Sequence, residues 1–127
     1  MAIVTLSTPE KAKEKCSSIF KNNPVVICLY YWTRCGHCIE FAPIWNKVTS
    51  KYSKTLTIVN IELEAMKKLS PKYQTSAFPT IVVFKNDKKY MEYTNGRTEK
   101  EIHAFLKLFA SDEKPKKKAK KQKVVEE

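Results

Sequence analysis

The chain of 127 residues contains only two glycines, two arginines and four cysteines, and it lacks a long apolar run. So few glycines exclude collagen-like sequence, and four cysteines are too few for a disulfide-dense miniprotein. No stretch approaches the roughly 18 apolar residues that cross a bilayer, and residues 1–15 lack the apolar segment of a secretory signal. We therefore expect a protein that neither crosses a membrane nor is secreted.

Lysine is the residue that the chain has in excess. Lys and Arg number 24 against 13 Asp and Glu, which gives a formal net charge of +11. Residues 111–127 hold seven lysines, four acidic residues and almost nothing to bury, so we predict a disordered tail after a folded domain at 1–110. The tail accounts for +3, which leaves +8 on the domain. The preference for lysine over arginine indicates an AT-rich genome, such as that of a large DNA virus or a protist.

The lysine cluster at residues 116–121 of the tail has three interpretations. It resembles a nuclear-import signal that an import receptor binds, and it has the charge to bind nucleic acid or another polyanion through phosphate groups. It can also act only as a solubilising tail. The tail contains no aromatic residue, so base-specific recognition is not expected.

Strands and helices alternate along residues 1–110. Apolar and β-branched runs predict strands at residues 3–6, 25–31, 56–61, 80–84 and 89–93. Apolar residues at helical spacing predict helices ending near residue 22, over 38–52, over 65–73 and after residue 98. Capping-box patterns at Ser7–Glu10 and Thr98–Glu101 mark two helix starts. The resulting order, β-α-β-α-β-α-β-β-α, predicts an α/β sandwich.

The strongest functional signal is Cys35-Gly36-His37-Cys38, between a buried strand and the start of a helix. A Cys-x-x-Cys pair in this setting is typical of a redox centre. Free N–H groups and the helix dipole favour a thiolate at Cys35, and the spacing lets Cys38 close a disulfide with it. His37 between them stabilises that thiolate further, which makes the disulfide more oxidising.

These residues resemble the thioredoxin-fold family, with a Cys-Gly-His-Cys centre of the protein disulfide isomerase type. The resemblance covers about residues 1–110 and rests also on Pro43, on Phe78-Pro79-Thr80 before a strand and on Asn95-Gly96 before the last helix. It implies the thioredoxin fold, a three-layer α/β/α sandwich with a mixed sheet. It further implies a kink at Pro43 and a cis proline at Pro79, which faces the disulfide across a groove.

The resemblance implies thiol–disulfide exchange with protein substrates and no cofactor. Cys35 is then the nucleophile that attacks a substrate disulfide, and Cys38 is the resolving thiol. The backbone at Phe78, beside Pro79, would pair with an extended substrate segment. Glutathione or a thioredoxin reductase would supply electrons.

Three positions depart from the family pattern. Leu29 stands where the family has a buried acid that accepts the proton of the resolving cysteine. Without that acid, resolution of the mixed disulfide is slowed. Alternatively, Leu29 only fills the core, and water or His37 moves the proton. Arg34 replaces a tryptophan and either stabilises the Cys35 thiolate and favours acidic substrates or glutathione, or is a solvated loop charge. Phe78 is bulkier than usual, and it either narrows the groove or forms its apolar wall.

Other candidate residues carry weaker signals. Cys16 and Cys28 are expected to be inert buried thiols, although a pairing between them stays open. His103 is expected to be exposed. Zinc needs four ligands, and the chain has no second Cys-x-x-Cys or paired histidine, so neither a metal nor a bridged iron–sulfur cluster is expected.

We therefore predict a thiol–disulfide oxidoreductase. The chain ends Val124-Val125-Glu126-Glu127, without an endoplasmic reticulum retention signal. The expected location is consequently the cytoplasm, the nucleus or a virion, and not the endoplasmic reticulum. The alternative is a thioredoxin-fold interaction module with little turnover and a basic surface that binds polyanions.

Overall fold

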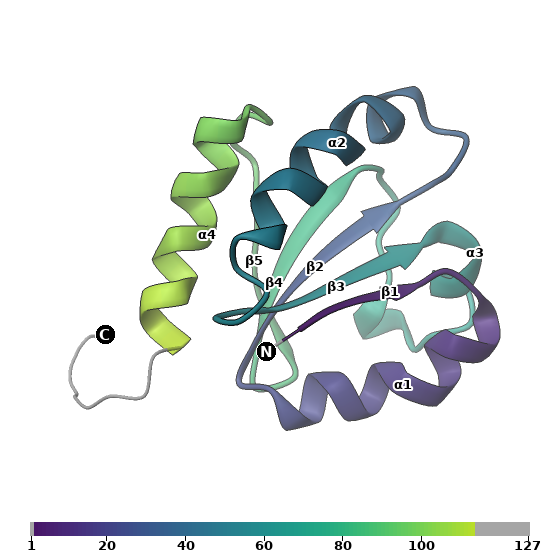
Figure 1. The fold of residues 1–127 in the computed structure, drawn as a ribbon. Coiled ribbons are helices and arrows are strands. Elements are labelled where there is room, and N and C mark those ends of the chain that lie inside the picture. The colour runs from purple at the N-terminus through teal and green to yellow at the C-terminus, as the bar shows by residue number, and fades with distance from the viewer. Residues whose placement is uncertain (1, 114–127) are drawn as a thin grey trace.

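The computed structural model describes residues 2–113, in which a mixed sheet of five strands has helices on both faces (Figure 1). The strands are β1 (Ile3–Leu6), β2 (Val25–Tyr31), β3 (Thr57–Glu62), β4 (Thr80–Lys85) and β5 (Lys88–Glu92). The helices are α1 (Pro9–Asn22), α2 (Gly36–Ser50), α3 (Leu63–Met66), the short 3-10 helix η1 (Pro71–Tyr73) and α4 (Glu99–Glu113). The predicted three-layer α/β/α sandwich is confirmed.

The sheet has the strand order β1-β3-β2-β4-β5. β1, β3 and β2 run parallel, whereas β4 and β5 are antiparallel to their neighbours. β2 therefore lies at the centre, and all its residues from Val25 to Tyr30 are buried. A central strand covered on both faces has no solvent side, which explains why the sequence of β2 is a continuous apolar run.

The alternation of side chains along β2 divides the core in two. Val25, Ile27 and Leu29 pack with side chains of α2 and α4, on one face of the sheet. Val26, Cys28 and Tyr30 pack with side chains of α1 and α3, on the other. Because successive residues of a strand point to opposite faces, neighbouring positions in the sequence serve different layers. Figure 1 shows α2 and α4 on one side of the sheet and α1 on the other.

Two helix starts were predicted from capping boxes, and one is displaced by a residue. Thr8, and not Ser7, caps α1, because its hydroxyl accepts the N–H of Lys11 at 3.3 Å and Pro9 then takes the first helical position. At the other start the hydroxyl of Thr98 accepts the N–H of Glu101 at 3.2 Å, as predicted.

The predicted third helix at 65–73 is wrong. The chain forms α3, which begins two residues earlier and ends at Met66, and then η1, which begins at Pro71. The ring of Pro71 disfavours helical geometry in Ser70, the residue before it, so a single helix cannot run from 65 to 73. β5 begins one residue earlier than predicted, because Asn86 and Asp87 both have positive φ, at 53° and 66°, and close a tight hairpin of the type I′ kind.

α4 runs to Glu113, three residues past the predicted end of the domain at 110. Those residues include no proline or glycine that would end a helix earlier. Residues 114–127 lie outside the described residues, so the interpretations of the lysine-rich tail stay predictions. Within residues 2–113, no helix is both long and apolar enough to cross a membrane.

Candidate active site

Cys35 caps the N-terminus of α2, the helix that carries the Cys-x-x-Cys motif. Its sulfur accepts the N–H of Cys38 at 3.2 Å, the position that a capping oxygen takes in other helices. The sulfur therefore lies at the positive end of the helix dipole, where an anion is favoured. α2 continues through Pro43 to Ser50.

The two motif cysteines differ in accessibility. Cys35 is half-buried, whereas Cys38 is only 5% exposed. Burial, assisted by its hydrogen bond with Cys35 and the charge there, raises the pKa of Cys38 to about 11, against smaller opposing effects from Trp32 and Arg97. Cys38 is therefore a protonated thiol near neutral pH, and Cys35 is the sulfur that a substrate reaches first.

The Phe78–Pro79 segment lies opposite Cys35, and the peptide bond between the two residues is cis, as the resemblance implied. The Cys35 thiol points to the carbonyl oxygen of Phe78 at 3.8 Å. This juxtaposition brings together residues 43 positions apart in the sequence. An extended segment bound at Phe78 would lie beside the reactive sulfur.

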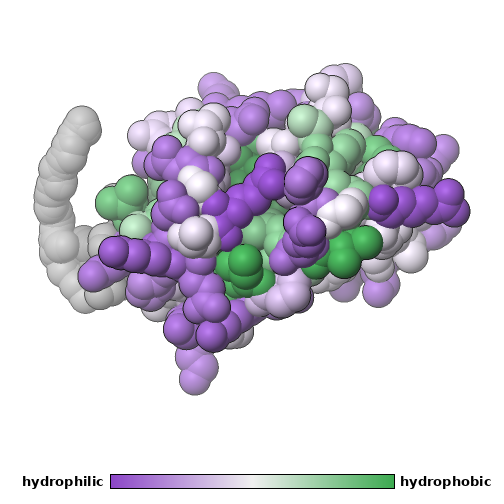
Figure 2. All heavy atoms as spheres, turned by 90° about the horizontal axis from the view of Figure 1, so that it is seen from above, coloured by the Kyte–Doolittle hydropathy of each residue, from purple (hydrophilic) through white to green (hydrophobic). Residues whose placement is uncertain are grey.

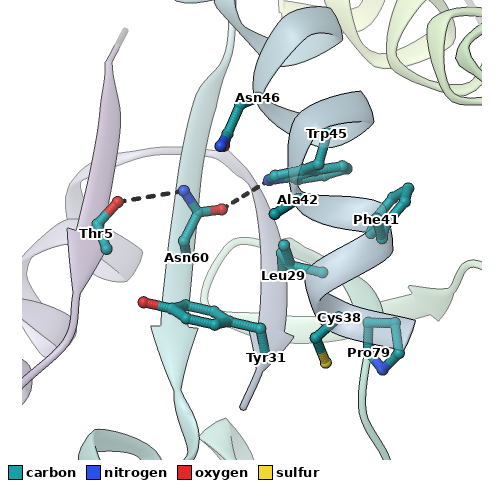
Figure 3. A pocket seen from close by; sticks show the side chains of 10 residues that line it. All are labelled: Thr5, Leu29, Tyr31, Cys38, Phe41, Ala42, Trp45, Asn46, Asn60 and Pro79. Carbon is teal, nitrogen blue, oxygen red and sulfur yellow. Dashed lines mark hydrogen bonds between the residues drawn. The ribbon is translucent and has the colours of Figure 1, made fainter. Parts of the chain in front are cut away.

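A cavity of about 200 Å³ lies behind Cys38, between α2 and the sheet (Figure 3). Within it a hydrogen-bond chain joins three elements: Trp45 Nε1 donates to Asn60 Oδ1 at 2.8 Å, and Asn60 Nδ2 donates to Thr5 Oγ1 at 3.3 Å. Its lining consists of the following side chains: Thr5, Leu29, Tyr31, Cys38, Phe41, Ala42, Trp45, Asn46, Asn60 and Pro79.

No side chain that lines this cavity carries a carboxylate or an ammonium group. Leu29, at the departure from the family pattern, is 5% exposed and belongs to the core cluster of that face. The cavity therefore offers Cys38 no charged proton acceptor, and the proton of the resolving thiol has to leave through water or another group.

The side chains of His37 and Arg34, beside the two motif cysteines, lie on the surface. The ring of His37 is 77% exposed and lies 3.7 Å from the Glu40 carboxylate. A side chain at Gly36 would meet nothing within 4 Å, so glycine is not sterically required there. Arg34 is exposed. The predicted effects of His37 and Arg34 on Cys35 stay predictions.

Arg97, in the loop between β5 and α4, is a site residue that the sequence analysis missed. It lines a hollow of about 350 Å³ together with Phe41, Phe78 and Pro79. It also lines a second hollow of about 220 Å³ with Phe41 and His37. Its positive charge is one of the influences that lower the pKa of Cys38.

Asn60 was also missed. It is a polar residue of strand β3, 7% exposed, and its neighbours on both sides, Val59 and Ile61, are apolar. A buried amide needs hydrogen-bond partners, so a lone asparagine in such a run was the available signal. The sequence contains no such signal for Arg97, because it lies about 60 residues from the motif cysteines and contacts at that separation cannot be inferred from a local pattern.

Cys16 and Cys28 lie on the other face of the sheet, in the cluster beneath α1, and both are free thiols. Burial raises the pKa of Cys16 to about 12 and that of Cys28 well above its ordinary value. His103 is exposed, as expected, and its Nδ1 lies 3.0 Å from the Tyr52 hydroxyl. Within residues 2–113, no three His, Cys, Asp or Glu side chains converge on a position for a metal ion.

Comparisons with known proteins agree with this fold and site. The family model Thioredoxin matches residues 7–108. The chain is 35% identical over 98 residues to "Protein disulfide-isomerase like 2-2" of Arabidopsis thaliana, covering 77% of this chain and 21% of that protein. It is 32% identical over 106 residues to "Probable protein disulfide-isomerase A6" of Medicago sativa, covering 81% and 28%. The chain thus spans only 21% and 28% of the length of these two relatives.

Solved structures share the fold at lower identity. The J-Trx1 fragment of ERdj5 superimposes with a TM-score of 0.71 at 17% identity, over 86% of this chain and 52% of that one. Reduced thioredoxin pre-protein of Schistosoma mansoni gives 0.63 at 23% identity, over 86% and 99%. The fold is therefore the thioredoxin fold, as predicted. With the family model matching most of its length, this chain belongs to the thioredoxin family and has relatives among thiol–disulfide oxidoreductases.

Proposed function

We propose that the chain exchanges disulfides with protein substrates through Cys35 and Cys38. The observation that supports this most strongly is the contrast within the motif. An accessible sulfur caps α2, and a buried thiol lies one turn later. The cis Phe78–Pro79 segment opposite supports a substrate-binding role for these two residues.

The proposed reaction has two displacement steps. The Cys35 thiolate attacks one sulfur of the substrate disulfide, so that a mixed disulfide forms and the other substrate sulfur leaves as a thiolate. Cys38 then loses its proton to water and its thiolate attacks Cys35, which releases the second substrate sulfur. The substrate gains two electrons, and the protein is left with a Cys35–Cys38 disulfide.

The direction of flux depends on the reduction potential. Protein disulfide isomerase has a potential of about −180 mV and thioredoxin about −270 mV. His37 in the motif supports a value on the oxidising side of thioredoxin, suited to oxidation or isomerisation. Glutathione or a thioredoxin reductase stays the proposed electron source, and a cytoplasmic, nuclear or virion location stays a proposal.

Trapping of the intermediate tests this function. The Cys38→Ser variant of the full chain, incubated with a disulfide-linked peptide, is expected to accumulate a covalent adduct of one peptide half on Cys35. Peptide mapping by mass spectrometry identifies the modified cysteine, and reductant releases the adduct. A Cys35→Ser variant that forms as much adduct at Cys38 would contradict the assigned roles.

A second function is supported by Leu29 and by the excess of lysine. A cavity without a carboxylate is compatible with a module of little turnover that uses its basic surface to bind a polyanion. If Cys35→Ser retains the full biological effect of the chain, this alternative replaces the enzyme.

A further inference from the structure

The two arginines of the chain both lie at the redox motif or at the groove beside it, although lysine supplies the other 22 of its 24 basic residues. Arg34 directly precedes Cys35, and Arg97 reaches the same region from the loop before α4. Arginine binds carboxylates through two parallel hydrogen bonds, which lysine cannot do. The arginines therefore give this region a chemistry that the lysine-rich surface elsewhere lacks.

Arg97 occupies the boundary between two hollows. Both hollows include Phe41 and Arg97 in their lining, and one continues along Phe78 and Pro79. That segment approaches Cys35, since the Phe78 carbonyl oxygen is 3.8 Å from the sulfur. A peptide whose cysteine meets Cys35 and whose backbone follows Phe78 would therefore place neighbouring side chains close to Arg97.

The guanidinium of Arg97 is available to a ligand. It makes no hydrogen bond or ion pair with another side chain of the described residues, and it is exposed. The only acids that line the two hollows are Glu92 in the larger and Glu40 in the smaller. Glu40 already faces the His37 ring at 3.7 Å.

The surface around these hollows contains both apolar and charged side chains. Figure 2 looks down on the end where α2 and the start of α4 lie, and it shows apolar surface between hydrophilic side chains. Phe41 is 3% exposed and supplies part of the apolar lining. A substrate segment with one acidic and several apolar side chains matches such a surface.

Resting on the function proposed above, we infer that Arg97 is a specificity-determining residue that binds a carboxylate of the substrate beside its disulfide. The preferred substrates are peptide segments with an Asp or Glu within two residues of the reacting cysteine. Glu92 acts against this preference, because its negative charge lines the same hollow.

The test uses peptides in which one cysteine carries a coloured aromatic thiol as a mixed disulfide. Peptides differ only in having Glu, Gln or Lys near the cysteine. Release of the coloured thiolate measures capture by the reduced full chain. We expect capture to be about two- to fivefold faster for Glu than for Gln, the range of a solvent-accessible ion pair, and slowest for Lys.

Variants separate the local charge from the net charge. Arg97→Gln should remove the preference for Glu, and Arg97→Lys should keep the preference only in part. Glu92→Gln should strengthen it. Lys13→Gln removes one charge from an exposed position of α1, on the opposite face of the sheet. This variant should leave the preference for Glu unchanged.

The outcomes distinguish this inference from the function on which it rests. If the reduced chain releases no coloured thiolate from any peptide, the proposed exchange reaction fails. If release occurs but the Glu, Gln and Lys peptides react equally, or Arg97→Gln keeps the preference, exchange stands and Arg97 is not the carboxylate site.

Discussion

The two pairs of cysteines in this chain lie on opposite faces of one sheet, and the chemistry expected of them differs accordingly. Cys16 on α1 and Cys28 on β2 face each other's element in a mostly apolar cluster, and they are only 2% and 0% exposed. Cys35 and Cys38 lie at the N-terminus of α2, where one sulfur is accessible and accepts a backbone N–H. The same residue type thus becomes an inert packing group or a redox centre according to burial and to the helix end beside it.

The alternation of β2 keeps the two pairs apart. Cys28 points to the α1 face, whereas its neighbour Leu29 points to the α2 face and lines the cavity behind Cys38. A shift of one residue in the register of β2 would exchange these positions. The strand therefore determines which thiol can take part in exchange, and the following predictions test that division.

The largest expected effect is the loss of exchange in Cys35→Ser. Removing the nucleophile should lower the rate of peptide disulfide reduction by at least about 1,000-fold, because no other described sulfur is both accessible and placed at a helix start. The rate is measured with reduced glutathione as the electron donor. The matched variant Cys28→Ser should keep the exchange rate, and equal losses in both variants would contradict the division between the pairs.

Restoring a proton acceptor behind Cys38 should have the next largest effect. Leu29→Glu places a carboxylate in the cavity, where it can take the proton of Cys38 as a general base. Resolution of a preformed mixed disulfide at pH 7 should become roughly tenfold to hundredfold faster. Leu29→Gln is the control, since it has the same shape without the charge, and equal rates for Glu and Gln would show that proton transfer does not limit resolution.

The unmodified chain should resolve mixed disulfides faster as the pH rises. A thiol reacts as its thiolate, and the pKa of Cys38 lies near 11 in the reduced protein, mainly through burial. In the mixed disulfide the charge of Cys35 is lost, but burial remains. The rate should therefore increase about tenfold per pH unit between pH 6 and 8, as followed by quenched-flow mass spectrometry. A rate that levels off near pH 7 would contradict a buried thiol that lacks a base.

The smallest effect on exchange should come from the buried pair. Cys16→Ala and Cys28→Ala should change the exchange rate by less than about twofold, because neither thiol touches the substrate groove. Cys28→Ala should also reduce the free energy of unfolding by about 1–1.5 kcal/mol, because it removes a fully buried sulfur from this cluster and leaves a small cavity. Urea unfolding measures the loss, and a stability equal to that of the unmodified chain would contradict the tight burial of Cys28.

Local patterns predicted most of the fold. The apolar run of β2 and the stripe of α4 correspond to buried surfaces, as expected from their periodicity. The prediction of a third helix at 65–73 was wrong because α3 ends at Met66 and η1 begins only at Pro71. Side-chain periodicity therefore did not show where the helix ends.

The candidate site was only partly predictable, for a related reason. Cys35 and Cys38 are three residues apart in the sequence, so the motif alone identifies them. Asn60 and Arg97 approach the site from β3 and from the loop before α4, through contacts that only the folded sheet creates. Sequence showed the reacting atoms, and the structure added the cavity and the groove around them.

The most direct test of the division between the two pairs is an equilibrium titration of all four thiols. The full chain is equilibrated in glutathione buffers of graded potential, alkylated and mapped by mass spectrometry. The account predicts a single two-electron transition that joins Cys35 to Cys38, while Cys16 and Cys28 stay free thiols at every potential. A disulfide between Cys16 and Cys28, or a Cys35 and Cys38 that never pair, would contradict it.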